Sequence, residues 1–358
     1  MKNKELNAPV CDATKDDKSA TAGYIKKATA LLTLLLLLGQ IVMAQYNPPG
    51  PPYPTQFKVA LDGSGDFKTI QEAVNSVRDL SQVQVKIYIK KGVYKEKLVI
   101  PSWKTNISLI GEDKDSTIIT GNDYSQKPLL TKDNTGATKF STYTSYTVLV
   151  QGNDIAIENL TIQNTAGRIG QAVALHVEGD RFMIKDCKLL GNQDTLYAAT
   201  ENSRQYYKNC YIEGTTDFIF GEATCVFQSC IIKSLTNSFI TAASTRPNHQ
   251  FGFVFFDCKL IADTAAKKVY LGRPWRPNAK VVFINTEMGN HILKEGWDNW
   301  RNPENEKTVL FAEYNSTGEG ANAKNRVKWS KQLSKREVKN YNLQNIFKGT
   351  VMWLPAYN

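Results

Sequence analysis

From Ile155 onward the sequence repeats one short unit, and this repeat limits the possible folds more than any other feature. Each unit is an alternating apolar segment, then a small polar residue, then a second short apolar segment. The central positions of six successive units are 27, 23, 20, 28 and 28 residues apart: Leu160, Cys187, Cys210, Cys230, Cys258 and Thr286. Each is preceded by a residue type that tolerates a left-handed turn: Asn159, Asp186, Asn209, Ser229, Asp257 and Asn285. Each unit therefore predicts strand, turn and strand.

A repeat of this length, with short strands and no helices between them, predicts a solenoid of strands. One coil is too thin to bury its own apolar side chains, so successive coils must stack and share a core. We therefore expect an all-β protein built as a parallel β-helix. A β-propeller is the alternative, but each of its blades needs about forty residues. Ahead of the repeat, Thr69 and Glu72 form a capping box, which predicts a short helix as an N-terminal cap.

The cysteines fall on the repeat rather than on a disulfide or metal pattern. Of the six, five lie beyond the N-terminal leader, an odd number, and none of their spacings is CxxC. Four of them occupy the central positions of successive units. Because free cysteine is among the most buried residue types, we expect these four side chains to form a ladder inside the solenoid.

Two aspartates occupy the same place in adjacent repeat units. Asp194 lies seven residues after Cys187, and Asp217 lies seven residues after Cys210. Equal offsets place the two carboxyl groups in one column of the solenoid, and stacked strands about 4.8 Å apart bring them within roughly 5 Å. Two carboxylates this close cannot both ionise freely, so we expect one pKa to rise and the other to fall. Such a pair can supply one acid and one base.

The N-terminal segment has the form of a targeting signal. Lys26 and Lys27 precede an apolar run that ends with small residues at Val42 and Ala44, which predicts a signal peptide over residues 1–44. An uncleaved membrane anchor is the alternative, since the run approaches the length that spans a bilayer. A Pro-rich linker is expected over residues 45–56 and a single domain over residues 57–358. The mature protein would then be secreted or periplasmic, without stable insertion in a membrane.

The net charge narrows the class of partner. Removal of the predicted signal peptide takes away six Lys and four acidic residues, so the formal charge falls from +10 to +8. A basic exported protein meets acidic polymers faster, because a field of one sign attracts the opposite charge. Acidic polysaccharide and nucleic acid both fit this charge, and charge alone does not distinguish them.

Other catalytic arrangements are not represented in the sequence. The three histidines, His176, His249 and His291, are scattered singly without metal-ligand spacing, and no G-x-S-x-G motif is present. Gly63 and Gly65 lack the full spacing of a phosphate-binding loop. We therefore expect neither a metal nor another cofactor.

A cation and several aromatic residues are expected near the two aspartates. Arg273 lies about two coils beyond Asp217, close to 10 Å in strand spacings, which its long side chain can largely cover. A guanidinium there would bind a carboxylate through two hydrogen bonds and hold it ionised. Aromatic faces that suit sugar rings are expected near the same column, from Tyr197, Phe220 and Trp275.

Five motifs occur in order along the chain: GVYKE (residues 92–96), QAVAL (171–175), QDTL (193–196), DFIFG (217–221) and LGRPW (271–275). Together they resemble one enzyme family, the pectinesterases or pectin methylesterases. The segments DGSGDFKTIQEAV, EGWDNW and FAEYNSTGEGA are similar to this family too, so the resemblance covers nearly all of the chain after the leader. It implies a right-handed parallel β-helix.

The resemblance also implies roles for individual residues. Asp217 resembles the nucleophile that attacks the methyl ester of galacturonate, and Asp194 resembles the general acid that protonates the departing methanol and then acts as a base. Gln171 and Gln193 match the amides that stabilise the oxyanion. Arg273 is similar to the residue that orients the nucleophile, and Trp275 to a substrate-stacking position.

The expected function is therefore hydrolysis of galacturonate methyl esters in pectin, which releases methanol. The expected partner is methyl-esterified pectin rather than nucleic acid, and the expected form is a monomer. A glycosidase is the main alternative, because two carboxyl groups about 5 Å apart also suit a retaining glycosidase. A lyase would need calcium, for which no dense acidic cluster is present. A carbohydrate-binding solenoid without activity would bind pectin and release nothing.

Overall fold

The computed structural model describes residues 27–34 and 53–355. Contacts divide the chain into two units, Met1–Tyr53 and Pro54–Asn358, and the second contains all the strands of the described residues. Within the first unit the described residues are a helical segment, residues 27–34, and Tyr53. Most of the predicted signal peptide (1–44) and linker (45–56) therefore lies outside the described residues, and the predicted division into domains stays a prediction. Among the described residues, no helix combines the length and apolar character needed to cross a membrane.

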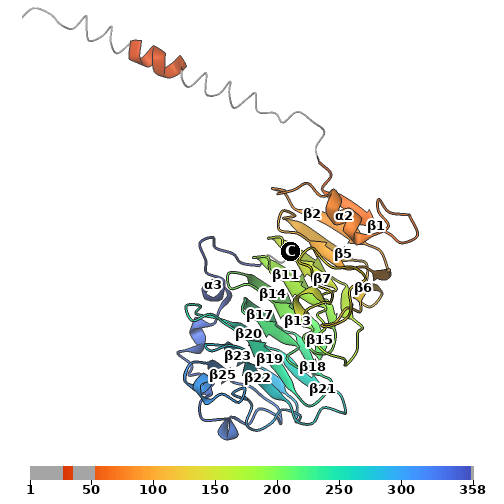
Figure 1. The fold of residues 1–358 in the computed structure, drawn as a ribbon. Coiled ribbons are helices and arrows are strands. Elements are labelled where there is room, and N and C mark those ends of the chain that lie inside the picture. Colours follow the sequence, from red (N-terminus) through yellow and green to blue (C-terminus); the bar gives the residue numbers. More distant parts are fainter. Residues whose placement is uncertain (1–26, 35–52, 356–358) are drawn as a thin grey trace, which may run out of the picture. The chain divides into compact units, whose positions relative to one another are not determined.

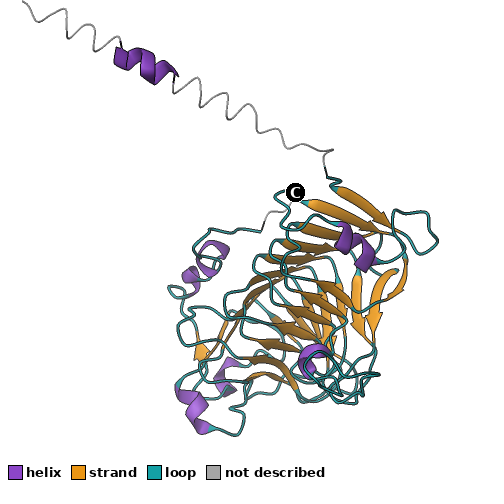
Figure 2. Ribbon diagram, turned by 45° about the horizontal axis from the view of Figure 1, so that its top comes forward, coloured by secondary structure: helices purple, strands orange, loops and turns teal. Residues whose placement is uncertain are grey.

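The second unit is a solenoid of parallel strands, as the repeat predicts (Figure 1). Every pairing between its named strands is parallel, and each strand inside a sheet pairs with the equivalent strands of the preceding and following coils. Three sheets therefore run along the solenoid, and Figure 2 shows their strands stacked coil upon coil. The predicted all-β parallel β-helix is confirmed.

The three sheets contain eleven, eight and seven strands. The eleven-stranded sheet consists of β1 (Gln56–Val59), β2 (Val85–Ile89), β5 (Ile107–Gly111), β8 (Ile155–Glu158), β11 (Phe182–Lys185), β14 (Arg204–Lys208), β17 (Thr224–Gln228), β20 (Phe253–Phe256), β23 (Lys280–Ile284), β25 (Leu310–Tyr314) and β26 (Lys331–Gln332). The eight-stranded sheet consists of β3 (Gly92–Lys95), β6 (Thr117–Gly121), β9 (Thr161–Asn164), β12 (Lys188–Leu190), β15 (Tyr211–Gly214), β18 (Ile231–Ser234), β21 (Lys259–Ala262) and β24 (Glu287–Met288). The seven-stranded sheet consists of β4 (Leu98–Ile100), β7 (Val148–Val150), β10 (Leu175–Val177), β13 (Leu196–Ala198), β16 (Ile219–Gly221), β19 (Phe239–Ala243) and β22 (Tyr270–Pro274).

The few helices of the second unit are short. They are α2 (Ile70–Ser76), η1 (Thr142–Thr144), η2 (Pro303–Lys307), η3 (Ala323–Asn325), η4 (Val338–Asn340) and α3 (Leu343–Ile346). The predicted N-terminal cap is α2: the Thr69 side chain accepts from the Glu72 N–H, and the Glu72 carboxylate accepts from the Thr69 N–H. Its apolar face, which includes Ile70 and Val74, is fully buried in the core.

The turn inside each repeat unit is left-handed, as the polar residues predict. The φ angles at the six positions before the central residues lie between 52° and 56°. The four cysteines form the predicted buried ladder, and each thiol donates to the carbonyl two residues before it, for example Cys187 to Lys185 at 3.2 Å. Thr286 ends the series, and its hydroxyl makes the equivalent bond at 3.4 Å. Each of these carbonyls also accepts a backbone N–H from the preceding coil, so the small donor adds a second hydrogen bond to it.

Stacked aromatic rings fill the core behind the eleven-stranded sheet. Tyr207, Phe227, Phe255 and Phe283 come from four successive coils, with ring centroids 4.6, 4.5 and 4.3 Å apart. All four are completely buried. The strand spacing of about 4.8 Å imposes this offset stacking, and burial of each ring contributes about 2–3 kcal/mol. The column fixes the register of the coils and, with it, the placement of the side chains on the opposite, seven-stranded sheet.

Candidate active site

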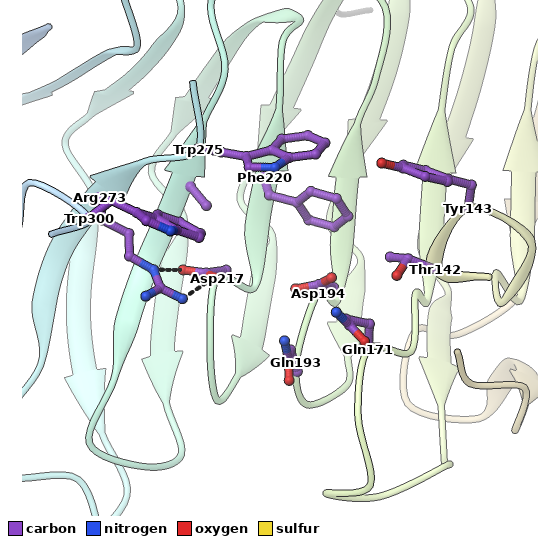
Figure 3. A pocket seen from close by; sticks show the side chains of 11 residues that line it. Thr142, Tyr143, Gln171, Gln193, Asp194, Asp217, Phe220, Arg273, Trp275 and Trp300 are labelled. Carbon is purple, nitrogen blue, oxygen red and sulfur yellow. Dashed lines mark hydrogen bonds and ion pairs between the residues drawn. The ribbon is translucent and has the colours of Figure 1, made fainter. Parts of the chain in front are cut away.

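The two aspartates lie together in a pocket on the outer face of the seven-stranded sheet (Figure 3). Asp194 precedes β13 and Asp217 precedes β16, and these strands pair with Leu196 opposite Ile219. The two positions are therefore in register, as the repeat predicts. The pocket is lined by Thr142, Tyr143, Gln171, Gln193, Asp194, Asp217, Phe220, Ala242, Arg273, Trp275 and Trp300.

A second left-handed turn in each coil places these aspartates. The φ angle is 66° at Asp194 and 49° at Asp217, a conformation that short polar side chains tolerate best. The backbone N–H groups of both residues still donate to the next coil, to Thr216 and Phe239, at 3.1 and 2.9 Å. The backbone is thus fixed on both sides while each carboxyl group points into the pocket, where it is more than nine-tenths buried.

Arg273 reaches Asp217 across two coils. Its Nε donates to Oδ1 at 2.9 Å and its Nη2 to Oδ2 at 2.7 Å, the paired geometry that suits a guanidinium and a carboxylate. Two aromatic rings hold the guanidinium: its Cζ lies 3.9 Å from the centroid of Phe239 and 3.7 Å from that of Trp300. Such cation–π contacts stabilise a partly desolvated cation by about 1–2 kcal/mol. The predicted reach of Arg273 to Asp217 is confirmed, and its aromatic support was not predicted.

Asp194 has a different environment. In the described part of the chain its carboxyl group has neither a hydrogen-bond partner nor an ion pair, although it is buried. Burial and the negative charge of Asp217 raise its pKa to about 8, and the more distant Arg273 opposes this only in part. At neutral pH the Asp194 carboxyl group is therefore mainly protonated and can donate a proton.

The pKa of Asp217 differs from the expectation. The sequence predicted that its pKa falls, but burial raises it above the ordinary aspartate value, and the nearby Asp298 adds to the rise. The hydrogen bonds and the charge of Arg273 lower it, which offsets part of this effect. The correction has a simple cause: the pocket that brings the arginine close also removes water from the carboxylate. Of the two carboxyl groups, Asp217 is the one stabilised in its charged form by a direct cation.

Two glutamines line the pocket beside Asp194. Gln171 and Gln193 face each other in a parallel bridge between neighbouring coils, and the Ala172 N–H donates to the Gln193 carbonyl at 3.1 Å. Neither side-chain amide has a hydrogen-bond partner within residues 27–34 and 53–355. Both are therefore available to donate to a ligand oxygen. They are neutral, so they do not stabilise the charged form of Asp194 as a second cation would.

The three predicted aromatic residues are brought together, but only two of them line this pocket. Phe220 and Trp275 line it, and Tyr197 stacks flat against Phe220 with centroids 4.5 Å apart. Tyr197 lines the adjoining cleft, which shares Tyr143 and Trp275 with the pocket. The aromatic surface is therefore continuous from the carboxyl groups to the neighbouring cleft.

The sequence did not reveal four residues of this site. Trp300 and Phe239 hold Arg273, and Thr142 and Tyr143 form the opposite wall from the short helix η1. Trp300 lies in the EGWDNW segment, whose likeness to the family was the only available signal. Phe239 lies in β19, and Thr142 and Tyr143 lie in η1; the sequence of neither element is distinctive.

Comparison with known proteins agrees with this geometry. The family model described as Pectinesterase matches residues 56–350. The chain belongs to the pectinesterase family. Pectinesterases are carboxylic ester hydrolases.

Individual pectinesterases are similar over most of the chain. Pectinesterase 31 of Arabidopsis thaliana is 36% identical over 283 residues, which are 78% of this chain and 88% of that protein. Probable pectinesterase/pectinesterase inhibitor 23 of the same plant is 34% identical over 331 residues, but the match covers 56% of its length. The chain thus spans nearly all of one relative and about half of another.

Solved pectin methylesterase structures share the fold. The carrot enzyme superposes with a TM-score of 0.75 at 34% identity, over 84% of this chain and 94% of that one. A pectin methylesterase in complex with a hexasaccharide has a TM-score of 0.71 at 30% identity, over 86% of this chain and all of that one. The enzyme from Erwinia chrysanthemi has a TM-score of 0.70 at 29% identity over the same shares.

Proposed function

We propose that this protein removes methyl groups from esterified galacturonate in pectin, with Asp217 as the nucleophile and Asp194 as the general acid and base. One observation carries the assignment of roles: a carboxylate bound by Arg273 lies in register with a buried carboxyl group whose pKa is about 8. The first is held charged and aimed, and the second holds a proton at neutral pH. Ester hydrolysis with a carboxylate nucleophile needs both, the first to attack the carbonyl carbon and the second to protonate the leaving group.

In the first step an oxygen of Asp217 attacks the carbonyl carbon of the methyl ester. The two hydrogen bonds from Arg273 fix the orientation of the carboxylate, which offsets its low intrinsic reactivity as a nucleophile. The carbonyl oxygen becomes negative in the tetrahedral intermediate. The free amides of Gln171 and Gln193 can donate to it, and loss of one such donor costs roughly 3 kcal/mol of barrier.

Asp194 then moves the protons. As the bond from the carbonyl carbon to the methoxy oxygen breaks, the Asp194 proton passes to that oxygen and methanol leaves. An anhydride joins the substrate to Asp217. Asp194, now a carboxylate, takes a proton from a water molecule that attacks the carbonyl carbon, and Asp217 departs as a carboxylate. The cycle ends with Asp194 protonated again and a new galacturonic acid, which ionises.

The aromatic surface suits a polysaccharide chain. Phe220, Trp275 and Tyr197 present apolar faces beside the carboxyl groups, and sugar rings pack on such faces through their C–H surfaces. The proposed partner is pectin, and the proposed site of action is outside the cytoplasm, in secreted or periplasmic form as the predicted signal peptide implies.

The test is product analysis on esterified pectin with the purified protein. Methanol and new acid groups should appear together in equal amounts, while the number of reducing ends stays constant. A rise in reducing ends without methanol would show a glycosidase instead. Binding to pectin with neither product would show a carbohydrate-binding protein, and it would overturn the proposal.

A further inference from the structure

The net charge of this protein is concentrated at its C-terminal end. Residues 315–358 contain eight Lys or Arg and two Glu, a net charge of +6. Residues 45–314, six times as many, contain 30 Lys or Arg against 28 Asp or Glu, a net charge of +2. Most of the predicted mature charge of +8 therefore lies in a segment that supplies no residue of the catalytic pocket.

Six cations of this segment are exposed and have no ion-pair carboxylate in the described part of the chain. Arg326 pairs with Glu313, and Lys331 with Glu337. Of the six, Lys348 lines a separate cleft with Asp180 and Arg204. We call the other five the basic strip: Lys324, Lys328, Lys335, Arg336 and Lys339. Because neighbouring acids do not neutralise them, their repulsion is relieved only by counterions or by an anionic partner.

The segment that carries the basic strip is fixed to the last coils. The buried Arg326 donates two hydrogen bonds to Glu313, at 2.7 and 3.0 Å, and a third to the Gly320 carbonyl at 2.8 Å. Strand β26 pairs with β25, and the Leu333 N–H donates to the Glu313 carbonyl at 2.9 Å. The five cations are thus presented by an ordered part of the solenoid.

The same segment touches the turn that leads into the wall of the pocket. Arg326 donates to the carbonyls of Leu293 and Lys294, and the Val327 N–H donates to the Glu295 carbonyl at 3.1 Å. Five residues beyond Glu295 the chain reaches Trp300, which lines the pocket and holds Arg273. The segment with the basic strip is thus joined to the turn that leads to Trp300.

We propose that the basic strip binds de-esterified galacturonan, the acidic product of the reaction, while the pocket works on esterified residues. This inference rests on the proposed function, because each turnover replaces a neutral ester by a carboxylate on the same chain. An exposed ion pair is individually weak, but several on one polymer add and release counterions together. The strip therefore favours chains that already carry acid blocks and holds the enzyme next to its own product.

The experiment compares three proteins on immobilised polygalacturonate at several salt concentrations. The first is the wild type. In the second, all five residues of the basic strip are changed to Gln (Lys324→Gln, Lys328→Gln, Lys335→Gln, Arg336→Gln, Lys339→Gln). The matched control carries the same loss of charge on the N-terminal coils. There, five exposed lysines form no ion pair with a carboxylate of the described residues: Lys68, Lys86, Lys91, Lys95 and Lys114.

The strip variant should bind polygalacturonate at least tenfold more weakly at low salt, with less than half of the wild-type dependence on salt concentration. The control should stay within about twofold of the wild type. Equal losses in both variants would mean that net charge alone matters, and no loss in the strip variant would mean that the strip does not bind. Tighter binding of the wild type to double-stranded DNA or anionic vesicles than to polygalacturonate would overturn the chosen partner.

Methanol release separates this inference from the proposed function. On a short, fully esterified oligosaccharide the strip variant should match the wild type, because the neutral substrate offers the strip no charge. On partly de-esterified pectin its KM should rise several-fold while kcat is unchanged. If the wild type releases no methanol, the proposed function fails while the binding comparison still stands. If methanol release is normal and KM does not change, the inference fails alone.

Discussion

The two sides of the pocket differ in how they treat the same residue type. On one side Asp217 receives two hydrogen bonds from Arg273, which lies between the rings of Phe239 and Trp300. On the other side Asp194 has only the neutral amides of the glutamines near it and is buried without a cation. One repeat position, used in two successive coils, thus produces a charged carboxylate and a protonated carboxyl group.

The difference shows that stacking of the coils brings the two aspartates close together. Residues from neighbouring coils then make the environments of the two carboxyl groups different. Both aspartates are buried to the same degree, so burial alone does not separate them. Asp217 has a direct cation because LGRPW lies two coils beyond it. Asp194 has no equivalent residue on its side, and the charge of Asp217 raises its pKa further. The five predictions below test this contrast.

The largest effect should come from the two aspartates. Asp217→Asn should lower kcat roughly 10⁴-fold or more, because it removes the nucleophile. Asp194→Asn should lower kcat by about 10²- to 10⁴-fold, because it removes the proton donor and base. Methanol release by the purified variants measures both. Near-normal activity in either variant, with an unchanged circular dichroism spectrum, would refute the assigned roles.

The neutral side of the pocket is tested by Gln193→Ala. This variant should lower kcat by about 10²- to 10³-fold with little change in KM, since the amide acts on the transition-state oxyanion. Gln193→Glu should be at least as inactive, because a carboxylate does not donate to an oxyanion at neutral pH. A variant that changes only KM would show that Gln193 binds the ground state.

The pH profile of activity reports the two sides separately. Asp217 must be ionised, and its raised pKa places the acid limb above the range of an ordinary aspartate. Asp194 must hold a proton, and its pKa of about 8 places the alkaline limb near pH 8. Activity should fall about tenfold per pH unit beyond each limb. A profile that stays flat down to about pH 4, or up to pH 10, would contradict this division.

The aromatic support of Arg273 should have a moderate effect. Trp300→Leu removes one ring from the guanidinium and should lower kcat/KM about tenfold, in line with about 1–2 kcal/mol for a partly desolvated cation–π contact. Because Trp300 also lines the pocket, a matched Phe239→Leu variant separates the two effects. If aromatic support of Arg273 matters, Phe239→Leu should also shift the acid limb of the pH profile. An unchanged acid limb in Phe239→Leu would mean that Trp300→Leu acts through the substrate instead.

The effect on stability has opposite signs for the two aspartates. Asp217→Asn leaves the guanidinium of Arg273 without its anion and should lower the free energy of unfolding. Asp194 has a raised pKa in the folded state, so its contribution to stability is lost as pH rises from about 4 to 8. The Asp194→Asn variant has no carboxyl group to ionise at this position, so it does not lose this stability. Relative to the wild type, its free energy of unfolding should rise across that window by at most about 1.4 kcal/mol per pH unit.

Denaturant unfolding at pH 5 and pH 8 measures these shifts. Between the two pH values the Asp194→Asn variant should gain on the wild type, and the Asp217→Asn variant should gain less, because Arg273 offsets part of the rise in the Asp217 pKa. If both substitutions change stability in the same direction at pH 8, the two carboxyl groups do not differ as the structure indicates.

The sequence alone determined the architecture and the pairing of the two aspartates. Equal spacing from Cys187 and Cys210 placed Asp194 and Asp217 in one column, because parallel stacking preserves offsets along the chain. The polar residues before the central positions predicted the left-handed turns for the same local reason. The repeat was recognised only from Ile155 onward, yet coils also precede it at β2 and β5, where the central polar and cysteine pattern is missing.

Only the tertiary structure decided how each carboxyl group behaves. The rings of Phe239 and Trp300 both contact the guanidinium of Arg273, although no shared sequence pattern links their positions. Helix η1 brings Thr142 and Tyr143 to the pocket from a loop outside the repeat. The direction of the Asp217 pKa was wrong from sequence, because it depends on how far water is removed around the carboxylate. Offsets along a periodic chain fix which groups are neighbours. The charge that each carboxyl group carries depends on its desolvation and on contacts with side chains from distant coils. Both are decided only when the chain is packed.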